Sequence, residues 1–294
     1  ESLDIKVSSL SQQPYQPSLV RVRYADPNPE GPGVKLENIP SSWEGTYPSR
    51  EQKFFPGSYG RVDSTGSLCR LEDFSALITL WPTRPGSGEQ TLISHQDSTS
   101  GWSLFLDDEG CLAAELGKAG DTRKFRLEGS LRERKWYQAW LTYDAQTSKL
   151  TLGKAILDPG LKSEDQIGSS TDYAFESVSQ EIPFLIGAQN SGPIDSHFNG
   201  KLEEPKIFSR SLDQQEIEQA FSGKIPDGLL ARWDFSREIP TSRMIDLGPE
   251  NLEGSLVNCP ARGMTDSNWN GKEMCWRHAP EDYAAIHFHE DDIY

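Results

Sequence analysis

Phe74-Ser-Ala-Leu-Ile-Thr-Leu-Trp81 decides the fold, because apolar side chains lie on both of its alternating faces. A strand of this kind is buried between two layers. Further short strands follow at intervals of about ten residues, separated by turn residues. They are TLISH (91–95), GWSLFL (101–106), CLAAEL (111–116), a strand at 125–127, WYQAWLTY (136–143) and KLTLG (149–153). This spacing predicts an all-β, antiparallel jelly-roll sandwich.

The flanking sequence predicts further strands around this block. Alternating apolar and polar residues predict one strand at Ile5 and Val7 and another at 20–24. We expect an ordered loop over a sheet face at 40–59 and an irregular surface excursion at 154–180. Strands resume in IPFLIGAQ (182–189), HFNGKLEEPKIFSRSL (197–212), GLLARWDFS (228–236) and AAIHFH (284–289). We divide the chain into N-terminal strands and loop (1–61), a sandwich (62–226) and a closing strand that begins another domain (227–294).

One short helix is expected after residue 210. Ser211-Leu-Asp-Gln214 fits a capping box, in which Gln214 reaches back to the amide of Ser211. Leu212 and Ile217 fall on one helical face, and Gly223 fits as the end of the helix.

The charge balance argues against nucleic-acid and membrane partners. The chain has 45 acidic and 29 basic residues, a formal net charge of −16, which repels phosphates and anionic lipids. No stretch approaches the roughly 20 apolar residues of a membrane helix. The four cysteines (Cys69, Cys111, Cys259 and Cys275) form no CxxC pair, so we expect reduced, buried thiols and a cytoplasmic protein.

The densest group of metal-ligand types lies near the C-terminal end. His287 and His289 would project from one face of a strand, and Asp291 and Asp292 follow immediately. They are candidate ligands for a transition metal. The alternative is a hydrogen-bonded network or a contact with a neighbouring domain, since a third and fourth ligand are not evident.

Two other kinds of binding site are conceivable from the sequence. Asp107-Asp108-Glu109 lies at a turn and offers oxygen ligands for calcium, although acidic turn residues are commonly just solvated. Trp43, Tyr47 and Tyr59 lie in loop-like sequence and could stack on a sugar ring. The alternative for these three aromatic residues is a place in the core or in a lid.

Catalytic patterns are lacking. The sequence contains no G-x-S-x-G elbow, Walker loop or G-x-G-x-x-G. Sandwich glycosidases place two carboxylates on one strand face. Glu203 and Glu204 are adjacent and would point to opposite faces, and Glu216 and Glu218 lie on the expected helix. We therefore expect no catalytic residue in this chain.

Residues 62–222 resemble the laminin-G-like, concanavalin-like jelly roll. The matching segments are Phe74-Ser-Ala76 with Trp81-Pro82, Gly101-Trp-Ser-Leu104, Trp136-Tyr137 with Leu141-Thr-Tyr-Asp144, Phe184-Leu-Ile-Gly187, Phe198-Asn-Gly-Lys-Leu-Glu-Glu204 and Phe208-Ser-Arg-Ser-Leu212. Where many relatives carry Asp, this chain has Glu203. The resemblance therefore does not carry calcium or glycan chemistry with it.

The flanks resemble the front part of N,N-dimethylformamidase large-subunit-like proteins, which are bacterial. The matching segments are Leu19-Val-Arg-Val-Arg-Tyr24, Gly31-Pro-Gly-Val-Lys35, Ala231-Arg-Trp-Asp-Phe-Ser236, Asp246-Leu-Gly248, Asn258-Cys-Pro-Ala-Arg-Gly263 and Ala285-Ile-His-Phe-His-Glu-Asp-Asp-Ile-Tyr294.

This second resemblance implies an amidohydrolase acting on small formamides. It implies iron held by Tyr and Glu side chains in a later domain, so no cofactor is expected in this segment. Expected partners are the remainder of the large subunit and a small partner subunit, in a homo- or hetero-oligomer. Our leading hypothesis is a non-catalytic, lectin-like scaffold module of such a large subunit, and the alternative is a carbohydrate-binding module that uses exposed aromatic residues of the sandwich.

Overall fold

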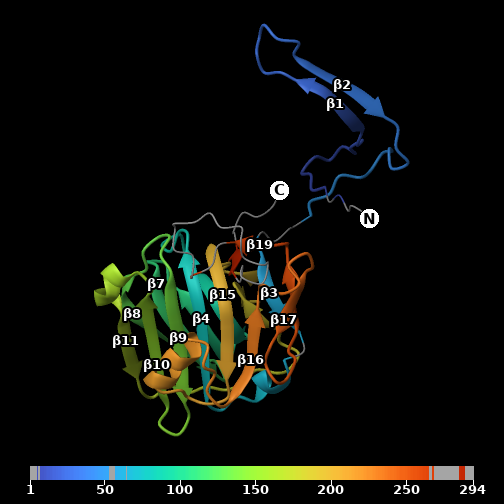
Figure 1. Cartoon of the computed structure of the whole chain (residues 1–294). Helices are drawn as coiled ribbons and strands as arrows, with labels where there is room; N and C mark the ends of the chain where they lie inside the picture. Colours follow the sequence, from blue (N-terminus) through green and yellow to red (C-terminus); the bar gives the residue numbers. More distant parts are fainter. Residues whose placement is uncertain are drawn as a thin grey trace. The chain divides into compact units, whose positions relative to one another are not determined.

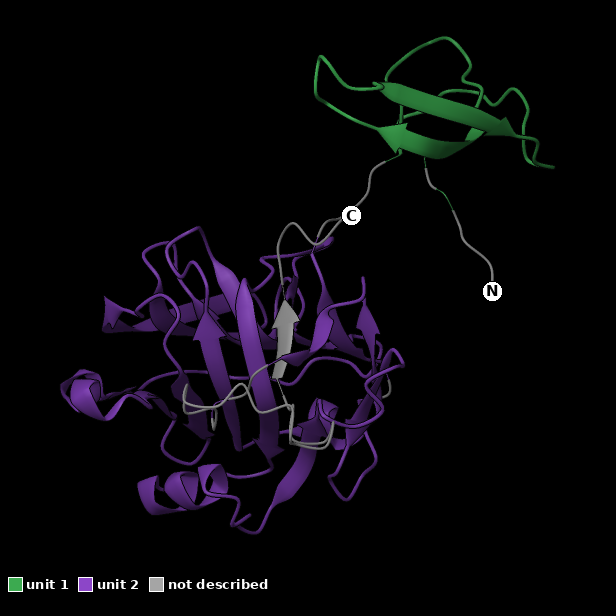
Figure 2. Ribbon diagram, turned by 45° about the horizontal axis from the view of Figure 1, so that its top comes forward, with its two compact units in different colours: residues 1–55 green, residues 56–294 purple. Residues whose placement is uncertain are grey.

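The computed structural model describes residue 5, residues 7–52, 57–63, 65–264 and 267, and the backbone of 285–288. The chain divides into two compact units, unit 1 (Glu1–Phe55) and unit 2 (Pro56–Tyr294), coloured separately in Figure 2.

Unit 1 is built on a two-stranded antiparallel sheet. Its strands are β1 (Leu19–Ala25) and β2 (Val34–Ile39), and an isolated bridge joins Tyr15 to Tyr47. The alternation of residues 20–24 is confirmed as a strand. The expected strand at Ile5 and Val7 is wrong, because neither residue has strand geometry.

Unit 2 is a sandwich of two antiparallel layers (Figure 1). One layer has the order β11-β10-β9-β4-β15-β16, and the other has the order β17-β18-β3-β12-β5-β6-β7-β8. Pairing of β16 with β17 joins them. The strands of the first layer are β4 (Phe74–Pro82), β9 (Tyr137–Asp144), β10 (Lys149–Ile156), β11 (Gln166–Ser170), β15 (Gly200–Phe208) and β16 (Leu229–Asp234). Those of the second are β3 (Tyr59–Val62), β5 (Gln90–Gln96), β6 (Gly101–Leu106), β7 (Cys111–Lys118), β8 (Asp121–Ser130), β12 (Phe184–Ile186), β17 (Arg243–Asp246) and β18 (Gly254–Val257).

The remaining elements of unit 2 are short. They are the hairpin β13 (Gln189–Asn190) and β14 (Ile194–Asp195), strands β19 (Ala261–Met264) and β20 (Ala285–Phe288), the 3-10 helices η1 (Gly66–Arg70) and η2 (Pro159–Glu164), and helix α1 (Gln214–Phe221). The predicted all-β sandwich is confirmed. The expected irregular excursion at 154–180 is wrong in part, because it contains η2 and the edge strand β11. No helix in the described part of the chain is long and apolar enough to cross a membrane.

Strand β4 is apolar on both faces because it is covered on both. Phe74, Ile78 and Leu80 belong to the main core between the layers. On the other face, Leu77 packs with Trp140 and with residues of α1. The predicted burial of both faces of this strand is therefore confirmed, and helix α1 covers the second face.

The cap of helix α1 differs from the one expected at Ser211 and Gln214. Asp213 is the N-cap: its side chain accepts from the Glu216 amide at 2.8 Å, and Glu216 accepts from the Asp213 amide at 3.1 Å. Leu212 lies before the helix, where it is buried and its amide donates to Ser75 Oγ. Leu212 and Ile217 lie in one cluster, as the residues of a hydrophobic staple do. Gly223 follows the helix with a φ of +85°, as expected.

The cysteines differ in exposure. Cys111 is buried, Cys69 is half-buried and Cys259 is exposed, and all three are free thiols. The expectation of buried thiols is thus wrong for Cys259, which follows β18 in a surface turn. Cys275 lies outside the described residues.

Strand β15 changes one of its partners halfway along its length. Gly200–Leu202 pairs with β20, whereas Lys206–Phe208 pairs with β16, and β4 lies along the other edge throughout. A bulge separates the two halves, and Glu204 has a φ of +47° there.

A charged cluster occupies this bulge. The Glu204 carboxylate binds the Lys206 ammonium at 2.6 Å and also pairs with the Arg232 guanidinium. The ammonium of Lys206 is almost fully buried, and desolvation lowers its pKa although Glu204 opposes this effect. Burial also favours the neutral form of Glu204, but the Lys206 and Arg232 charges hold its pKa below the ordinary value. Glu204 is therefore a charged structural group.

We expect Glu204→Gln to destabilise unit 2, because it leaves the Lys206 ammonium buried without a carboxylate. The loss should be about 3 kcal/mol of unfolding free energy, as for other buried pairs broken on one side. Urea titration of the purified variant measures it. The double variant Glu204→Gln/Lys206→Met removes both charges and should recover much of the loss. A single-variant loss below about 1 kcal/mol, typical of surface pairs, would contradict the role of the cluster.

We expect acidification to weaken the fold through His95, which is only 1 % exposed. Its Nε2 lies 3.1 Å from the Ile182 carbonyl, and burial lowers the pKa of its imidazole from 6.5 to about 4. The unfolded chain binds a proton at pH 6.5, so stability falls as the pH drops from 6.5 towards 4, by roughly 3 kcal/mol in total. Urea titrations from pH 7 to pH 4 should show this slope, and His95→Gln should abolish the His95 part of it. Equal slopes in both proteins would refute the assignment.

Candidate functional site

The candidate metal ligands lie mostly beyond what can be described. His287 belongs to β20, whose backbone pairs there with Lys201 of β15 and Ala261 of β19. The side chain of His287 and the whole of His289, Asp291 and Asp292 are outside the described residues. Within the described ranges, no three His, Cys, Asp or Glu side chains converge as metal ligands would.

Arg262 anchors the segment next to β20. Its guanidinium is half-buried, and burial lowers its pKa. It donates to backbone carbonyls of the β16–β17 connection and of the first residue of β17, those of Phe235 (2.9 Å), Arg237, Glu238 (3.0 Å), Thr241 (2.9 Å) and Arg243 (3.3 Å). Because these carbonyls surround one side chain, β19 is fixed against the loop, and β20 pairs with β19. Arg262 thus positions the backbone that leads to the candidate histidines.

The carboxylates of the candidate calcium turn already bind the guanidinium of Arg126. Asp107 accepts from the amides of Glu109 and Cys111 at 3.0 and 2.9 Å, as in an Asx turn. Arg126 forms ion pairs with Asp107 at 3.0 Å and with Glu109 at 2.9 Å. The hydrogen bonds to these two carboxylates raise the pKa of Arg126, and the bond to Glu109 has the larger effect. The arrangement favours a structural turn over a calcium site.

The three candidate aromatic residues are divided between the two units. In unit 1, Trp43 and Tyr47 are each 38 % exposed, and the Tyr47 hydroxyl donates to the Trp43 carbonyl at 2.7 Å. Tyr47 also stacks on Tyr15, with ring centroids 5.7 Å apart. In unit 2, Tyr59 is buried beside His197, with centroids 5.8 Å apart. Of the three candidates, Trp43 and Tyr47 are exposed and Tyr59 is not.

Sequence reasoning missed a polar cluster on the outer face of the second layer, where hairpin β13–β14 packs against β5. Gln189 is its centre. Its amide nitrogen donates to Glu89 at 3.2 Å and to Ser196 at 3.0 Å, and its oxygen accepts from Thr91 at 3.4 Å and Gln96 at 3.3 Å. These residues come from segments about 100 positions apart, so no spacing in the sequence could reveal the cluster.

Lys124 extends the polar cluster across β7 and β8. Its ammonium lies 2.9 Å from Glu89 and 3.4 Å from Glu115, and 4.8 Å from the centre of the Phe105 ring. Desolvation lowers its pKa, but the hydrogen bonds and charges of the two glutamates outweigh this and raise it. The cluster therefore pairs its polar groups with each other, and Phe105 is only 2 % exposed beneath Lys124.

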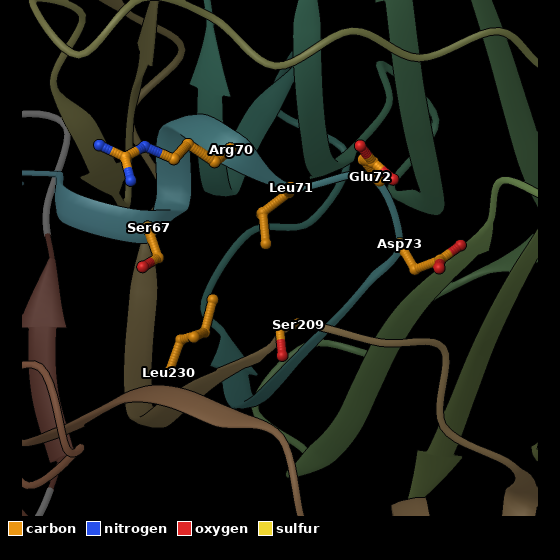
Figure 3. Close-up of a pocket in the computed structure, with 7 residues that line it drawn as sticks. All are labelled: Ser67, Arg70, Leu71, Glu72, Asp73, Ser209 and Leu230. Carbon is orange, nitrogen blue, oxygen red and sulfur yellow. The ribbon is translucent and has the colours of Figure 1, made fainter.

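A hollow of about 360 Å³ lies between the η1–β4 connection and the ends of β15 and β16. Its lining residues are Ser67, Arg70, Leu71, Glu72, Asp73, Ser209 and Leu230. Figure 3 shows Leu71 and Leu230 pointing toward one another, while Arg70 extends away from Glu72 and Asp73. The Ser67 amide donates to the Glu250 carboxylate at 3.1 Å, and Asp73 accepts from the Ala145 amide at 2.6 Å. The residues that line the hollow include no His or Cys, and the contacts of Ser67 and Asp73 hold the loops together.

One of two similar solved structures, the first named here, supports the fold. A putative carbohydrate-binding protein from Bacteroides ovatus has a TM-score of 0.50 at 15 % identity, with 76 % of this chain and 65 % of that chain covered. The carbohydrate-binding module of a Ruminococcus gnavus sialidase, determined with sialyllactose, has a TM-score of 0.47 at 17 % identity, with 57 % of this chain and 94 % of that chain covered.

Comparison with curated proteins confirms the resemblance seen in the flanks. The N,N-dimethylformamidase beta subunit of Paracoccus aminophilus is 33 % identical over 306 residues, and that of Alcaligenes sp. is 32 % identical over 303 residues. Each match covers 94 % of this chain and 40 % of the relative, so the chain spans less than half the length of these relatives.

The sandwich itself matches a family model. The model describes the concanavalin A-like lectin/glucanases superfamily and matches residues 56–218, more than half of the chain. The two antiparallel layers of unit 2 are the architecture that this family implies. The chain belongs to the concanavalin A-like lectin/glucanases superfamily.

Proposed function

We propose that this chain is a non-catalytic, lectin-like scaffold module of the large subunit of a formamide-cleaving metalloamidase. The observation that carries the proposal is that the sandwich keeps its aromatic residues away from water. In the described part of unit 2, no aromatic side chain is exposed. Trp81 and Trp136, which are half-buried, have the Lys201 ammonium 4.8 and 5.9 Å from their ring centres.

A sugar-binding face requires the opposite arrangement. Stacking on a pyranose requires an accessible ring and polar groups free to bind hydroxyls. In the polar cluster, Gln189 and Lys124 already bond to the neighbouring side chains. Buried aromatic residues and polar groups that are paired with one another suit a module that supports other parts of an assembly.

The assembly is proposed from the relatives. Both are named as beta subunits, which supports an oligomer with further polypeptides. We propose that the partners are the remainder of the large subunit and a small subunit, in the cytoplasm. We propose that iron and formamide hydrolysis belong to the part of the relatives that the match does not cover.

The alternative function, carbohydrate binding, rests on unit 1. Trp43 and Tyr47, two of the three aromatic candidates, are exposed there, whereas the candidate of the sandwich, Tyr59, is buried. Glycan binding by the purified chain, measured on a glycan array, would be the first requirement. Loss of that binding in Trp43→Ala would then favour this alternative.

A domain replacement in the Paracoccus aminophilus enzyme tests the scaffold role. We expect the beta subunit to lose assembly when the region matched by this chain is deleted, and to regain assembly, iron and dimethylformamide turnover when this chain replaces it. The isolated chain should neither hydrolyse dimethylformamide nor bind stoichiometric iron. Gel filtration, metal analysis and an activity assay give the readouts.

Two outcomes would reject the scaffold role. One is normal assembly and turnover after the deletion. The other is stoichiometric metal in the isolated chain that is lost on replacing His287 or His289 with Ala, because the site would then lie in this chain. His287→Ala and His289→Ala in the beta subunit that carries this chain serve as matched controls, and they should leave its iron content unchanged.

A further inference from the structure

Lys154 is a lysine whose side chain points into the sandwich. It lies on β10, and its neighbours on the same face of the strand, Leu152 and Ile156, are fully buried in the main core. Alternate residues of a strand share a face, so Lys154 occupies the position of a core residue. It is only 3 % exposed. A charged group at such a position is costly unless it finds partners.

The partners of Lys154 come from the other layer. Its Nζ donates to the carbonyl oxygens of Glu128 at 3.1 Å and Gly129 at 2.6 Å, both on β8. Strand β8 is the last strand of the second layer, and it also lies against β10 and β11 of the first layer (Figure 1). Lys154 therefore joins the two layers at the side of the sandwich where β8 and β11 are the edge strands.

A bulge in β8 brings these two carbonyls to Lys154. The register of β7 and β8 shifts between Cys111 and Ala113, so residues 127–129 stand opposite a single residue of β7. Gly129 has a φ of +75°, which glycine adopts without strain. Because a bulge interrupts the regular ladder between two strands, backbone groups in it need other partners. Lys154 is the partner for two of them.

The partners of this amine are carbonyls rather than carboxylates. Unlike Lys206, which binds Glu204, Lys154 forms no ion pair with a described carboxylate. A neutral amine has two N–H donors, which the two carbonyls satisfy, whereas an ammonium has three. Gln166 lies directly opposite Lys154 on β11, and its Oε1 is buried without a hydrogen-bond partner among the described residues. The contacts therefore suit the neutral amine.

The charged groups that face the buried amine are few. Desolvation lowers the pKa of the amine, and the opposing effects of Cys111 on β7 and Glu164 on η2 are smaller. Glu164 is bound by Arg132, whose Nε lies 2.8 Å from its carboxylate. Desolvation raises the pKa of the Cys111 thiol, so the thiol is uncharged at neutral pH. Asp165, which follows η2, accepts from the Ile156 amide at 2.7 Å. Burial thus favours the neutral amine more than these groups favour the ammonium.

We propose that Lys154 is a proton-sensitive bridge between the two layers, which holds the β8 bulge against β10 more tightly as a neutral amine than as an ammonium. The neutral amine keeps both carbonyl contacts without a buried charge. The ammonium keeps the same contacts but also buries a charge that no carboxylate compensates, so the bulge opens more readily to let water reach it. The inference goes beyond the proposed scaffold function, because it concerns how tightly one edge of the sandwich closes.

Urea titrations of the purified chain between pH 7 and pH 10 test the proposal. A lysine in the unfolded chain keeps its proton up to about pH 10.4, whereas Lys154 in the folded chain releases its proton at a lower pH. The unfolded chain then binds more protons, so the stability of unit 2 should rise with pH. Relative to Lys154→Met, the folding equilibrium constant of the wild-type chain should rise about threefold over this range. Lys118→Met removes an exposed lysine at the end of β7 and should keep the wild-type pH dependence, as the matched control.

A second variant and a second measurement keep the test independent of the folding of Lys154→Met. Gln166→Glu places a carboxylate directly opposite Lys154, where it favours the ammonium, and it should remove the rise of stability with pH. Hydrogen exchange, corrected for the intrinsic effect of pH, measures opening of the bulge itself. The amides of residues 127–131 should become about threefold better protected from pH 7 to pH 10 in the wild-type chain, and Gln166→Glu should lack this gain.

Three results would overturn the proposal. Equal pH dependence of stability in the wild-type chain and Lys154→Met would mean that the proton of Lys154 does not act on the fold. A wild-type stability that falls with rising pH, relative to Lys154→Met, would mean that the site holds the ammonium. Protection of residues 127–131 that does not change with pH would mean that the bulge does not respond. None of these results depends on formamide hydrolysis, so each leaves the domain-replacement test of the proposed function open.

Discussion

The buried ammonium of Lys206 is the constraint on which the sandwich of this chain depends. Strand β15 pairs with β20 over one half and with β16 over the other, and the bulge between the halves requires a positive φ at Glu204. A buried cation is costly unless it is paired. The Glu204 carboxylate pairs with it and with Arg232 on β16, so the charge that would destabilise the core instead fixes the position of the next strand.

The two halves of β15 connect the core of the sandwich to two different parts of the chain. Through β16 and β17 the chain joins the two layers, which completes the family architecture. Through β20 it contacts the segment that carries the candidate histidines, and Arg262 holds the neighbouring β19 in place with five backbone carbonyls. The polar groups of the sandwich are therefore largely engaged in holding its own segments together. This use of polar groups agrees better with a scaffold than with an open binding site.

The hairpin of unit 1 follows a different rule. In unit 2, apolar strands are covered by a facing layer or by helix α1, as Leu77 shows. In unit 1, the register of β1 and β2 places Val22 opposite Leu36 and Ala25 opposite Val34, and the described residues of unit 1 form no second layer of its own to bury them.

The sequence by itself determined the sandwich. One strand is apolar on both faces, and the strands around it are short and separated by turn residues. Few folds other than a sandwich bury a core with strands of this kind. The sequence also determined the existence and end of helix α1, whereas only the tertiary structure decided its cap, since Leu212 is drawn into a cluster with Leu77 and Trp140. The polar cluster around Gln189 could not be predicted, because its members meet only when segments 89–96 and 189–196 are brought together. The faces of Glu203 and Glu204 could not be assigned by simple alternation either, because the bulge interrupts it. Local periodicity reports which side chains avoid water, but the partners of buried charges and amides are set by contacts between residues far apart in the chain.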